Sequence, residues 1–154
     1  NMKFMLNGAI TLGTLDGANV EMLDAVGKEN MFIFGLTSSE VEELWLRGYR
    51  SADYYANNER LGRILSALSV GFGGESFSDI AGYLLNGHGV ADPYMCLADF
   101  ESYRMTHQSA VTQYRNRTAW TRMSLLNTAH SGFFAADRSI REYADRIWKL
   151  KPVQ

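Results

Sequence analysis

A strand, a helix and a second strand follow one another at the start of the chain, and this order restricts the fold more than any other feature. Residues 10–15 alternate apolar with small or polar side chains up to an Asp-Gly turn, which is typical of a strand. Residues 18–26 place apolar side chains at three-residue spacing before a glycine, which predicts a short helix. Residues 31–34, Met-Phe-Ile-Phe, predict a strand buried on both faces. Strands joined in this way run parallel, so the sequence predicts an α/β fold with a right-handed crossover.

From Thr37 onwards the sequence predicts mostly helices. Thr37 and Glu40 have the spacing of a capping box. Two apolar stripes follow at helical spacing, with glycine-rich joints at 71–74 and 86–89. The stripes consist of Leu61, Ile64, Leu65 and Leu68, and of Phe77, Ile80, Ala81 and Leu84. We therefore divide the chain into a βαβ segment, residues 1–36, and a mostly helical region of the same domain, residues 37–154.

Three longer helices are predicted in the last third of the chain, with Asp99, Thr118 and Asp137 as their N-caps. The first presents an apolar face that includes His107. The second faces the core with Trp120, Met123 and Leu126. The third has the clearest amphipathic pattern in the chain, formed by Ile140, Tyr143, Ala144, Ile147 and Trp148.

Composition and charge exclude several classes of protein. The 154 residues are 46% hydrophobic, enough for a core, and the formal charge of −2 with scattered basic residues argues against a nucleic-acid partner. No apolar stretch approaches the roughly 20 residues that span a bilayer, so we expect no membrane partner. A single cysteine, Cys96, excludes an internal disulfide and fits a reducing compartment such as the cytoplasm.

Lys3 is the candidate functional residue, because it is the only charge in the apolar run from Met2 to Leu6. An ammonium group among such neighbours either extends to water or is desolvated with a lowered pKa. A desolvated lysine is partly a neutral amine, the form that condenses with an aldehyde.

The residues around Lys3 carry a more specific signal. Residues 1–9 read NMKFMLNGA and residues 11–21 read TLGTLDGANVE. This stretch resembles the pyridoxal-phosphate lysine segment of the α-glucan phosphorylases, which act on glycogen, starch or maltodextrin. The resemblance is dense over the first 35 residues and returns at 98–100, 119–120 and 139–143.

The resemblance implies part of a Rossmann-like C-terminal domain, followed by a mostly helical tail. It also implies a Schiff base between pyridoxal 5'-phosphate and Lys3, with the cofactor phosphate near a helix start. The reaction would transfer an α-1,4-linked glucosyl unit from an α-glucan to inorganic phosphate, giving glucose 1-phosphate. The groups that hold these substrates would precede this segment, so no residue here is assigned a catalytic role. The absence of a methionine at position 1 fits a fragment of a longer, cytoplasmic enzyme.

Other polar residues are better explained by structural roles. For Asp16 we favour a turn that caps the next helix over a ligand contact, and for Asn7 and Thr14 a bond to neighbouring backbone. We expect Cys96 to be buried, His107 to lie in a core or interface, His88 in an exposed loop, and His130 at a helix end. No histidine pair or cysteine cluster has metal-ligand spacing, so no metal site is predicted.

Three functions remain open at this point. The first is a phosphorylase fragment that is inactive when isolated. The second is a non-catalytic helical module, in which the face of Ile140, Ile147 and Trp148 is partly exposed and invites self-association. In the resembled family this last helix packs toward the other domain. The third is a nucleotide-sugar glycosyltransferase, against which the lysine segment argues because those enzymes need no aldehyde cofactor.

Overall fold

The computed structural model describes residues 1–87 and 89–151. These residues form two compact units, one made of residues 1–33 with 106–151 and the other of residues 34–105. The long helix α7 (Cys96–Arg115) contributes its first half to the second unit and its second half to the first. The division into segments 1–36 and 37–154 of one domain stays a prediction.

The predicted strand–helix–strand order is present in the first unit. Strand β1 (Leu12–Gly13), helix α2 (Ala18–Val26), a 3-10 turn η1 (Lys28–Asn30) and strand β2 (Phe32–Ile33) follow in sequence. The two strands are parallel, with Leu12 opposite Phe32 and Gly13 opposite Ile33. Because helices dominate and the described sheet has two strands, the structure fits an α/β segment.

The strands are shorter and more exposed than predicted. Each has two residues, and both residues of β2 are only half-buried, so the expected burial on both faces is wrong. Of the apolar run 31–34, Met31 alone is buried. A sheet of two short strands offers little surface for helices to cover, and full burial needs helical layers on both faces.

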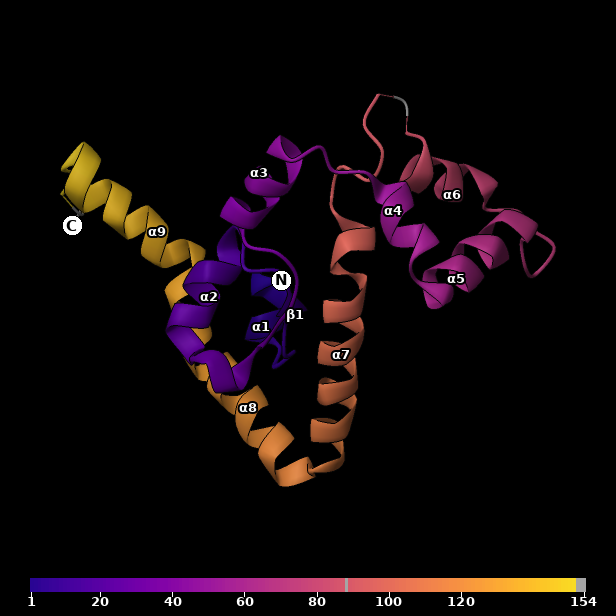
Figure 1. The fold of residues 1–154 in the computed structure, drawn as a ribbon. Coiled ribbons are helices and arrows are strands. Elements are labelled where there is room, and N and C mark those ends of the chain that lie inside the picture. The colour runs from indigo at the N-terminus through magenta and orange to yellow at the C-terminus, as the bar shows by residue number, and fades with distance from the viewer. Residues whose placement is uncertain (88, 152–154) are drawn as a thin grey trace. The chain divides into compact units, whose positions relative to one another are not determined.

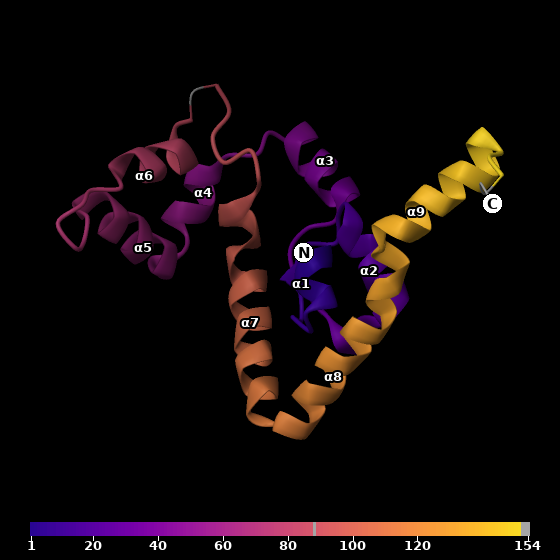
Figure 2. The same ribbon diagram turned by 180° about the vertical axis from the view of Figure 1, so that it is seen from behind.

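The core of the first unit is rich in methionine. Met5 of helix α1 (Met2–Leu6), Met22 and Val26 of α2, and Met31 are buried together. Helix α8 (Arg117–His130) and the 3-10 turn η2 (Ser131–Phe134) pack on α1, and α8 also contacts α2. Figure 2 shows α8 beside α1 and α2. The predicted inward face of α8 is confirmed, because Met123 is buried and Trp120 and Leu126 are half-buried.

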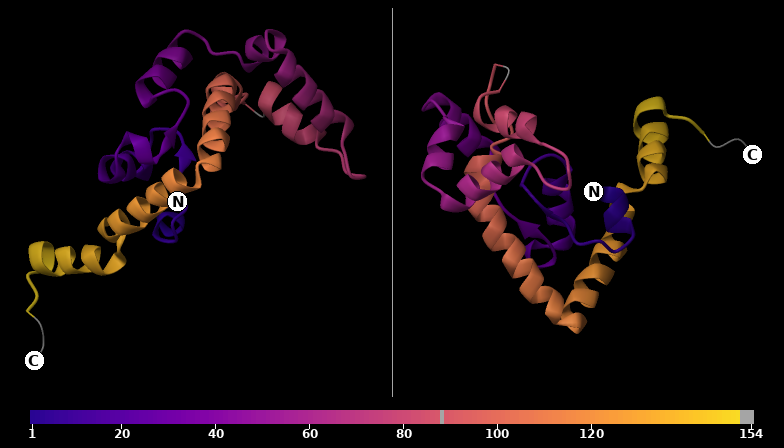
Figure 3. Two further views of the ribbon diagram at one scale, coloured as in Figure 1. Left: turned by 90° about the horizontal axis from the view of Figure 1, so that it is seen from below. Right: turned by 90° about the vertical axis from the view of Figure 1, so that its right-hand side faces the viewer.

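The C-terminal helix departs from a regular α-helix. Helix α9 (Ala136–Glu142) continues directly into a π-helix, η3 (Tyr143–Trp148), and Figure 3 shows this part of the chain extending beyond α1 and α2. Asp137 lies in the first turn and does not cap the helix, so that prediction is wrong. The predicted apolar face is largely exposed: Ile140 is 59% exposed, Ile147 63% and Trp148 55%.

The second unit is helical, as predicted. It contains α3 (Ser38–Leu46), α4 (Ser51–Ala56), α5 (Glu59–Val70) and α6 (Ser78–Leu85), and α5 and α6 lie side by side (Figure 1). The Thr37–Glu40 capping box is formed, with both of its hydrogen bonds present. The core consists of Leu61, Leu65, Ala81 and Leu97. Within the two predicted stripes, Ile64 and Ile80 are exposed, which narrows each buried face.

The predicted caps of α7 and α8 are wrong as well. Asp99 lies inside α7, where it is buried and accepts a hydrogen bond from the Leu36 amide at 2.8 Å. Asp92 takes the capping role instead: its carboxylate accepts from the Cys96 and Leu97 amides at 2.9 and 2.8 Å. Helix α8 is capped by Asn116, which accepts from the Ala119 amide, so Thr118 falls within the helix. Several polar residues near each start could cap, and tertiary packing selects among them.

Candidate functional site around Lys3

Lys3 is exposed in the structure. It lies in the five-residue helix α1, whose buried residue is Met5, while Met2, Phe4 and Leu6 are exposed as well. The apolar neighbours therefore do not desolvate the lysine, and of the two alternatives for its amine the chain adopts the solvated one. A run of apolar letters indicates burial only if another element covers it, and no described element covers this face of α1.

The start of α1 is tied to the end of strand β1 and the start of α2. The Asn1 side-chain amide donates to the Asn19 side-chain oxygen at 2.6 Å, and the Asn19 amide donates to the Thr14 carbonyl at 2.8 Å. Asn1 also accepts a hydrogen bond from the Met2 amide, which caps α1. The start of the helix that carries Lys3 is thus linked through Asn19 to the residue that follows the carboxyl end of β1, and α/β proteins bind their ligands at such strand ends.

The other end of α1 is held by α8. The Ser124 hydroxyl donates to the Gly8 carbonyl at 2.7 Å, across 116 residues of sequence. Gly8 has φ of 78°, and an added Cβ would lie 2.5 Å from the Ser124 hydroxyl oxygen, so a side chain there would strain the backbone and displace that hydroxyl. The Asn7 side chain donates to the Lys3 carbonyl at 2.8 Å, which confirms its predicted bond to backbone.

The predictions for the turn after β1 have mixed outcomes. Asp16 does not cap α2. The N-cap of this helix is Gly17, and no side-chain hydrogen bond caps its start. The Thr14 carbonyl accepts a hydrogen bond from the Asn19 side chain, but its hydroxyl forms no hydrogen bond among the described residues. The predicted bond between Thr14 and neighbouring backbone is therefore wrong. The residue that organises this turn is Asn19, the last of the Asp-Gly-Ala-Asn motif. Its role needs Asn1 to be close in space, which the local pattern does not reveal.

His107, His130 and Cys96 stay outside this site. His107 is exposed on α7, so a place in the core is wrong and a place in an interface stays a prediction. His130 ends α8 as predicted, and its ring Nδ1 lies 2.9 Å from the Leu126 carbonyl oxygen. His88 lies outside the described residues. Cys96 is exposed rather than buried, yet partial desolvation and the nearby Asp92 carboxylate raise the pKa of its thiol. A raised pKa disfavours the reactive thiolate.

Within residues 1–87 and 89–151, no three His, Cys, Asp or Glu side chains are grouped so that they could share a metal ion. Over the same part of the chain, none of the helices combines the length and the apolar character that crossing a bilayer requires.

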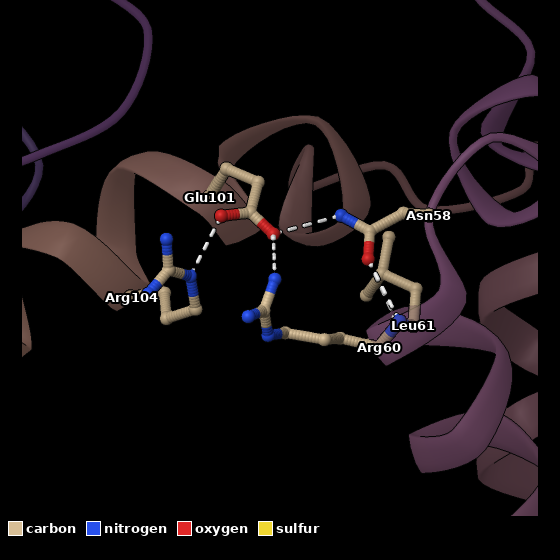
Figure 4. Close-up of polar contacts among 5 residues, drawn as sticks. All are labelled: Asn58, Arg60, Leu61, Glu101 and Arg104. Carbon is tan, nitrogen blue, oxygen red and sulfur yellow. Dashed lines mark hydrogen bonds and ion pairs between the residues drawn. The ribbon is translucent and has the colours of Figure 1, made fainter.

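A second polar cluster lies in the other unit and links α5 to α7 (Figure 4). The Glu101 carboxylate accepts from Asn58 at 2.9 Å and from Arg104 at 2.7 Å, and Arg60 lies 4.0 Å away. Asn58 also caps α5 by accepting from the Arg60 and Leu61 amides. The polar groups of these side chains are therefore partners of one another, and the cluster connects α5 to α7.

Neutralising Glu101 is expected to reduce stability slightly at neutral pH. Hydrogen bonds from Arg104 and Asn58 lower the pKa of Glu101, so the folded state favours the ionised form. This contribution is present above the unfolded-state pKa and is lost as pH falls through the lowered pKa. Urea unfolding of Glu101→Gln should give a small loss at neutral pH that disappears in acid. Glu42→Gln, on an exposed face of α3, is the control, and an equal loss at both pH values would contradict the interpretation.

The chain was compared with known proteins. The carbohydrate phosphorylase family profile matches residues 1–150. Glycogen phosphorylase of Haemophilus influenzae is 46% identical over 154 residues, which are 100% of this chain and 19% of that protein. The Synechocystis enzyme is 43% identical over 153 residues and the human muscle form 42% identical over 156, each covering 99% of this chain and 18% of the relative. The chain therefore belongs to the carbohydrate phosphorylase family, and it spans about a fifth of the length of these relatives.

Proposed function

We propose that this chain is the cofactor-lysine segment of a glycogen or other α-glucan phosphorylase. The parent would be a cytoplasmic glycosyltransferase that moves an α-1,4-linked glucosyl unit from glucan to inorganic phosphate, with glucose 1-phosphate as product. The family match over residues 1–150 supports a carbohydrate phosphorylase as the parent. The relatives with 43–46% identity are named glycogen phosphorylases. The observation that supports the proposal is the link from helix α1, which carries Lys3, through Asn1 and Asn19 to the Thr14 carbonyl directly after strand β1.

Lys3 is suited to holding pyridoxal 5'-phosphate covalently. Its amine is exposed and therefore reachable, and its helix is fixed at one end by Asn19 and at the other by Ser124. Such fixation lowers the entropy lost when a ligand is positioned. When bound, the cofactor supplies a phosphate whose second pKa, about 6, suits proton exchange with substrate phosphate near neutral pH. Helix α1 is too short to hold that phosphate alone, so we place its other contacts in a Rossmann-like domain of the longer parent.

The proposal is tested by trapping the cofactor on the lysine. The chain is mixed with pyridoxal 5'-phosphate, reduced with borohydride and digested, and the labelled peptides are identified by mass spectrometry. We expect the label on Lys3 to exceed that on Lys28, an exposed lysine of the same unit. Lys3→Ala should remove the preferred label and Lys28→Ala should leave it in place. Equal labelling of both lysines in the wild-type chain would count against the proposal.

The same preparation tests whether the segment acts alone. We expect no glucose 1-phosphate from glycogen and inorganic phosphate, because the groups that hold both substrates are proposed to lie outside this chain. Release of glucose 1-phosphate above a boiled control would overturn that part of the proposal while leaving the role of Lys3 open to the trapping experiment.

A second candidate function rests on the exposed face of α9 and η3. Ile140, Tyr143, Ile147 and Trp148 are each at least half exposed and lie along one short stretch of helix. An apolar face of this kind favours association, so the isolated chain could act as a non-catalytic helical module that pairs with itself. Light scattering after gel filtration distinguishes the two: Trp148→Glu should convert a dimer to a monomer without changing the label on Lys3.

A further inference from the structure

Two asparagine side chains connect the start of helix α1 to the end of strand β1 through an unbroken chain of hydrogen bonds. The Asn1 oxygen accepts from the Met2 amide at 2.9 Å, and the Asn1 side-chain nitrogen donates to the Asn19 oxygen at 2.6 Å. The Asn19 side-chain nitrogen then donates to the Thr14 carbonyl at 2.8 Å. The chain of bonds therefore runs from the backbone of the helix that carries Lys3 to the residue that follows β1.

The direction of these bonds requires an amide at position 19. A carbonyl can only accept, so the Asn19 nitrogen must face Thr14 and the Asn19 oxygen must face Asn1. A carboxylate at position 19 could still accept from Asn1, but it could not donate to Thr14, and its charge would lie against the carbonyl oxygen. Asn19 lies in the first turn of α2, where a negative charge would suit the helix dipole better than an amide does. The needs of α2 therefore do not account for the asparagine.

Gly13, the last residue of β1, leaves free the space that the Asn19 side chain needs. An added Cβ would lie 2.8 Å from the Asn19 side-chain nitrogen, whereas its distance to Thr11 Cγ2, 3.5 Å, would be an ordinary contact. The φ of Gly13 is outside the left-handed region, so its backbone conformation is open to alanine. A side chain at position 13 would thus act mainly by displacing Asn19.

We propose that Asn19 is a positioning residue for Lys3, because its amide fixes the start of α1 to the strand end at which α/β proteins bind ligands. This inference rests on the proposed function, since it takes Lys3 to be the lysine that holds the aldehyde cofactor. Asn19 acts through the backbone of α1. With its two bonds intact, less conformational freedom is lost when the lysine amine and the aldehyde are brought together.

The test is the trapping of pyridoxal 5'-phosphate on the 154-residue chain, read as the ratio of the label on Lys3 to the label on Lys28. The variant N19D keeps the shape of the side chain and removes its donor, and G13A displaces the unchanged Asn19 without adding charge. We expect each variant to lower the ratio about fivefold at neutral pH, the factor that corresponds to one net hydrogen bond of about 1 kcal/mol.

The matched control for the charge is N116D. Asn116 accepts from the Ala119 amide at the start of α8 in the same unit, and a carboxylate caps a helix equally well. N116D should therefore label as the wild-type chain does. G13A added to N19A should not lower the ratio below that of N19A alone, because no amide remains at position 19 to be displaced.

A pH profile separates positioning by the donor from a general loss of structure. With cyanoborohydride as the reductant, N19D should regain the wild-type ratio as the pH falls toward about 4, because a protonated carboxyl group donates to Thr14 as the amide does. G13A should stay low at every pH, and N116D serves as the reference. A ratio for N19D that stays low in acid would overturn the assignment of the effect to the donor.

The remaining outcomes distinguish this inference from the proposed function. Equal labelling of Lys3 and Lys28 in the wild-type chain refutes the proposed function, and the role of Asn19 with it. A wild-type preference for Lys3 that persists in N19D and G13A at neutral pH overturns the inference alone. Circular dichroism identifies the variants that fold, and if one of N19D and G13A does not fold, the other decides.

Discussion

Asp92→Ala is expected to destabilise the second unit by about 3 kcal/mol or more, since it removes three hydrogen bonds from a buried position. The Asp92 side chain has no exposed surface and accepts from the Tyr49 hydroxyl at 2.7 Å as well as from the Cys96 and Leu97 amides. Truncation leaves two amides at the start of α7 and one phenol without partners. Urea unfolding followed by circular dichroism measures the loss.

Two further variants separate the contributions to this effect. Tyr49→Phe removes one donor and keeps both helix-capping bonds, so it should cost about 1 kcal/mol. Burial and the hydrogen bond to Asp92 raise the pKa of Tyr49, so the phenol remains a donor to a higher pH than that of a free tyrosine. Asp79→Ala, at an exposed first-turn position of α6, should cost no more than about 1 kcal/mol. A loss for Asp92→Ala no larger than that of Asp79→Ala would show that Asp92 does not cap α7.

The caps mark the limit of what local sequence could predict. The Thr37–Glu40 box was predictable because both partners lie within one turn and the motif satisfies both of its own bonds. Asp92 was not, because it reaches Cys96 and Leu97 only with a backbone φ of 47°, which aspartate adopts rarely. Aspartate is a residue type that commonly caps helices, but Asp99 lies one turn into α7. Burial there raises the pKa of its carboxyl.

The candidate site around Lys3 likewise has features that local sequence predicted and features that it did not. The sequence was sufficient to single out Lys3 and the strand–helix–strand order that surrounds it, since both follow from residues close together in the chain. The exposure of Lys3 was not predictable, because it depends on whether another element covers α1. The bonds that fix this helix, from Asn19 and Ser124, join residues 18 and 116 positions apart, and periodicity carries no information about such pairs.

Two arginines of α8 show a third limit. Along the sequence they are separated by other residues and form no basic run, so charge patterning indicated a scattered surface. In the structure the helical repeat of α8 brings Arg117 and Arg122 to the border of one depression. Clustering of charge is therefore a property of the folded chain at this place, and a linear count of basic residues underestimates it.

Met5→Ala is expected to cost about 2–5 kcal/mol in the unfolding free energy of the first unit. Met5 has no exposed surface and packs with Met22, Val26 and Met31 in the core. It is also the buried residue of α1, so its side chain holds the helix that carries Lys3 against the rest of the unit. The loss is measured by thermal or urea unfolding, with Met2→Ala, at a 40% exposed position of the same helix, as the control.

A volume-conserving variant distinguishes loss of packing from loss of the methionine itself. Met5→Leu should cost less than about 1.5 kcal/mol, because it retains the buried volume. Since Met5 anchors the helix of Lys3, Met5→Ala should also reduce the preference of pyridoxal 5'-phosphate for Lys3 over Lys28 in the trapping experiment, while Met5→Leu preserves it. If Met5→Ala lost stability but kept the full preference for Lys3, the bonds of α1 to Asn19 and Ser124 would be sufficient to position the lysine, and the core would not contribute to the site.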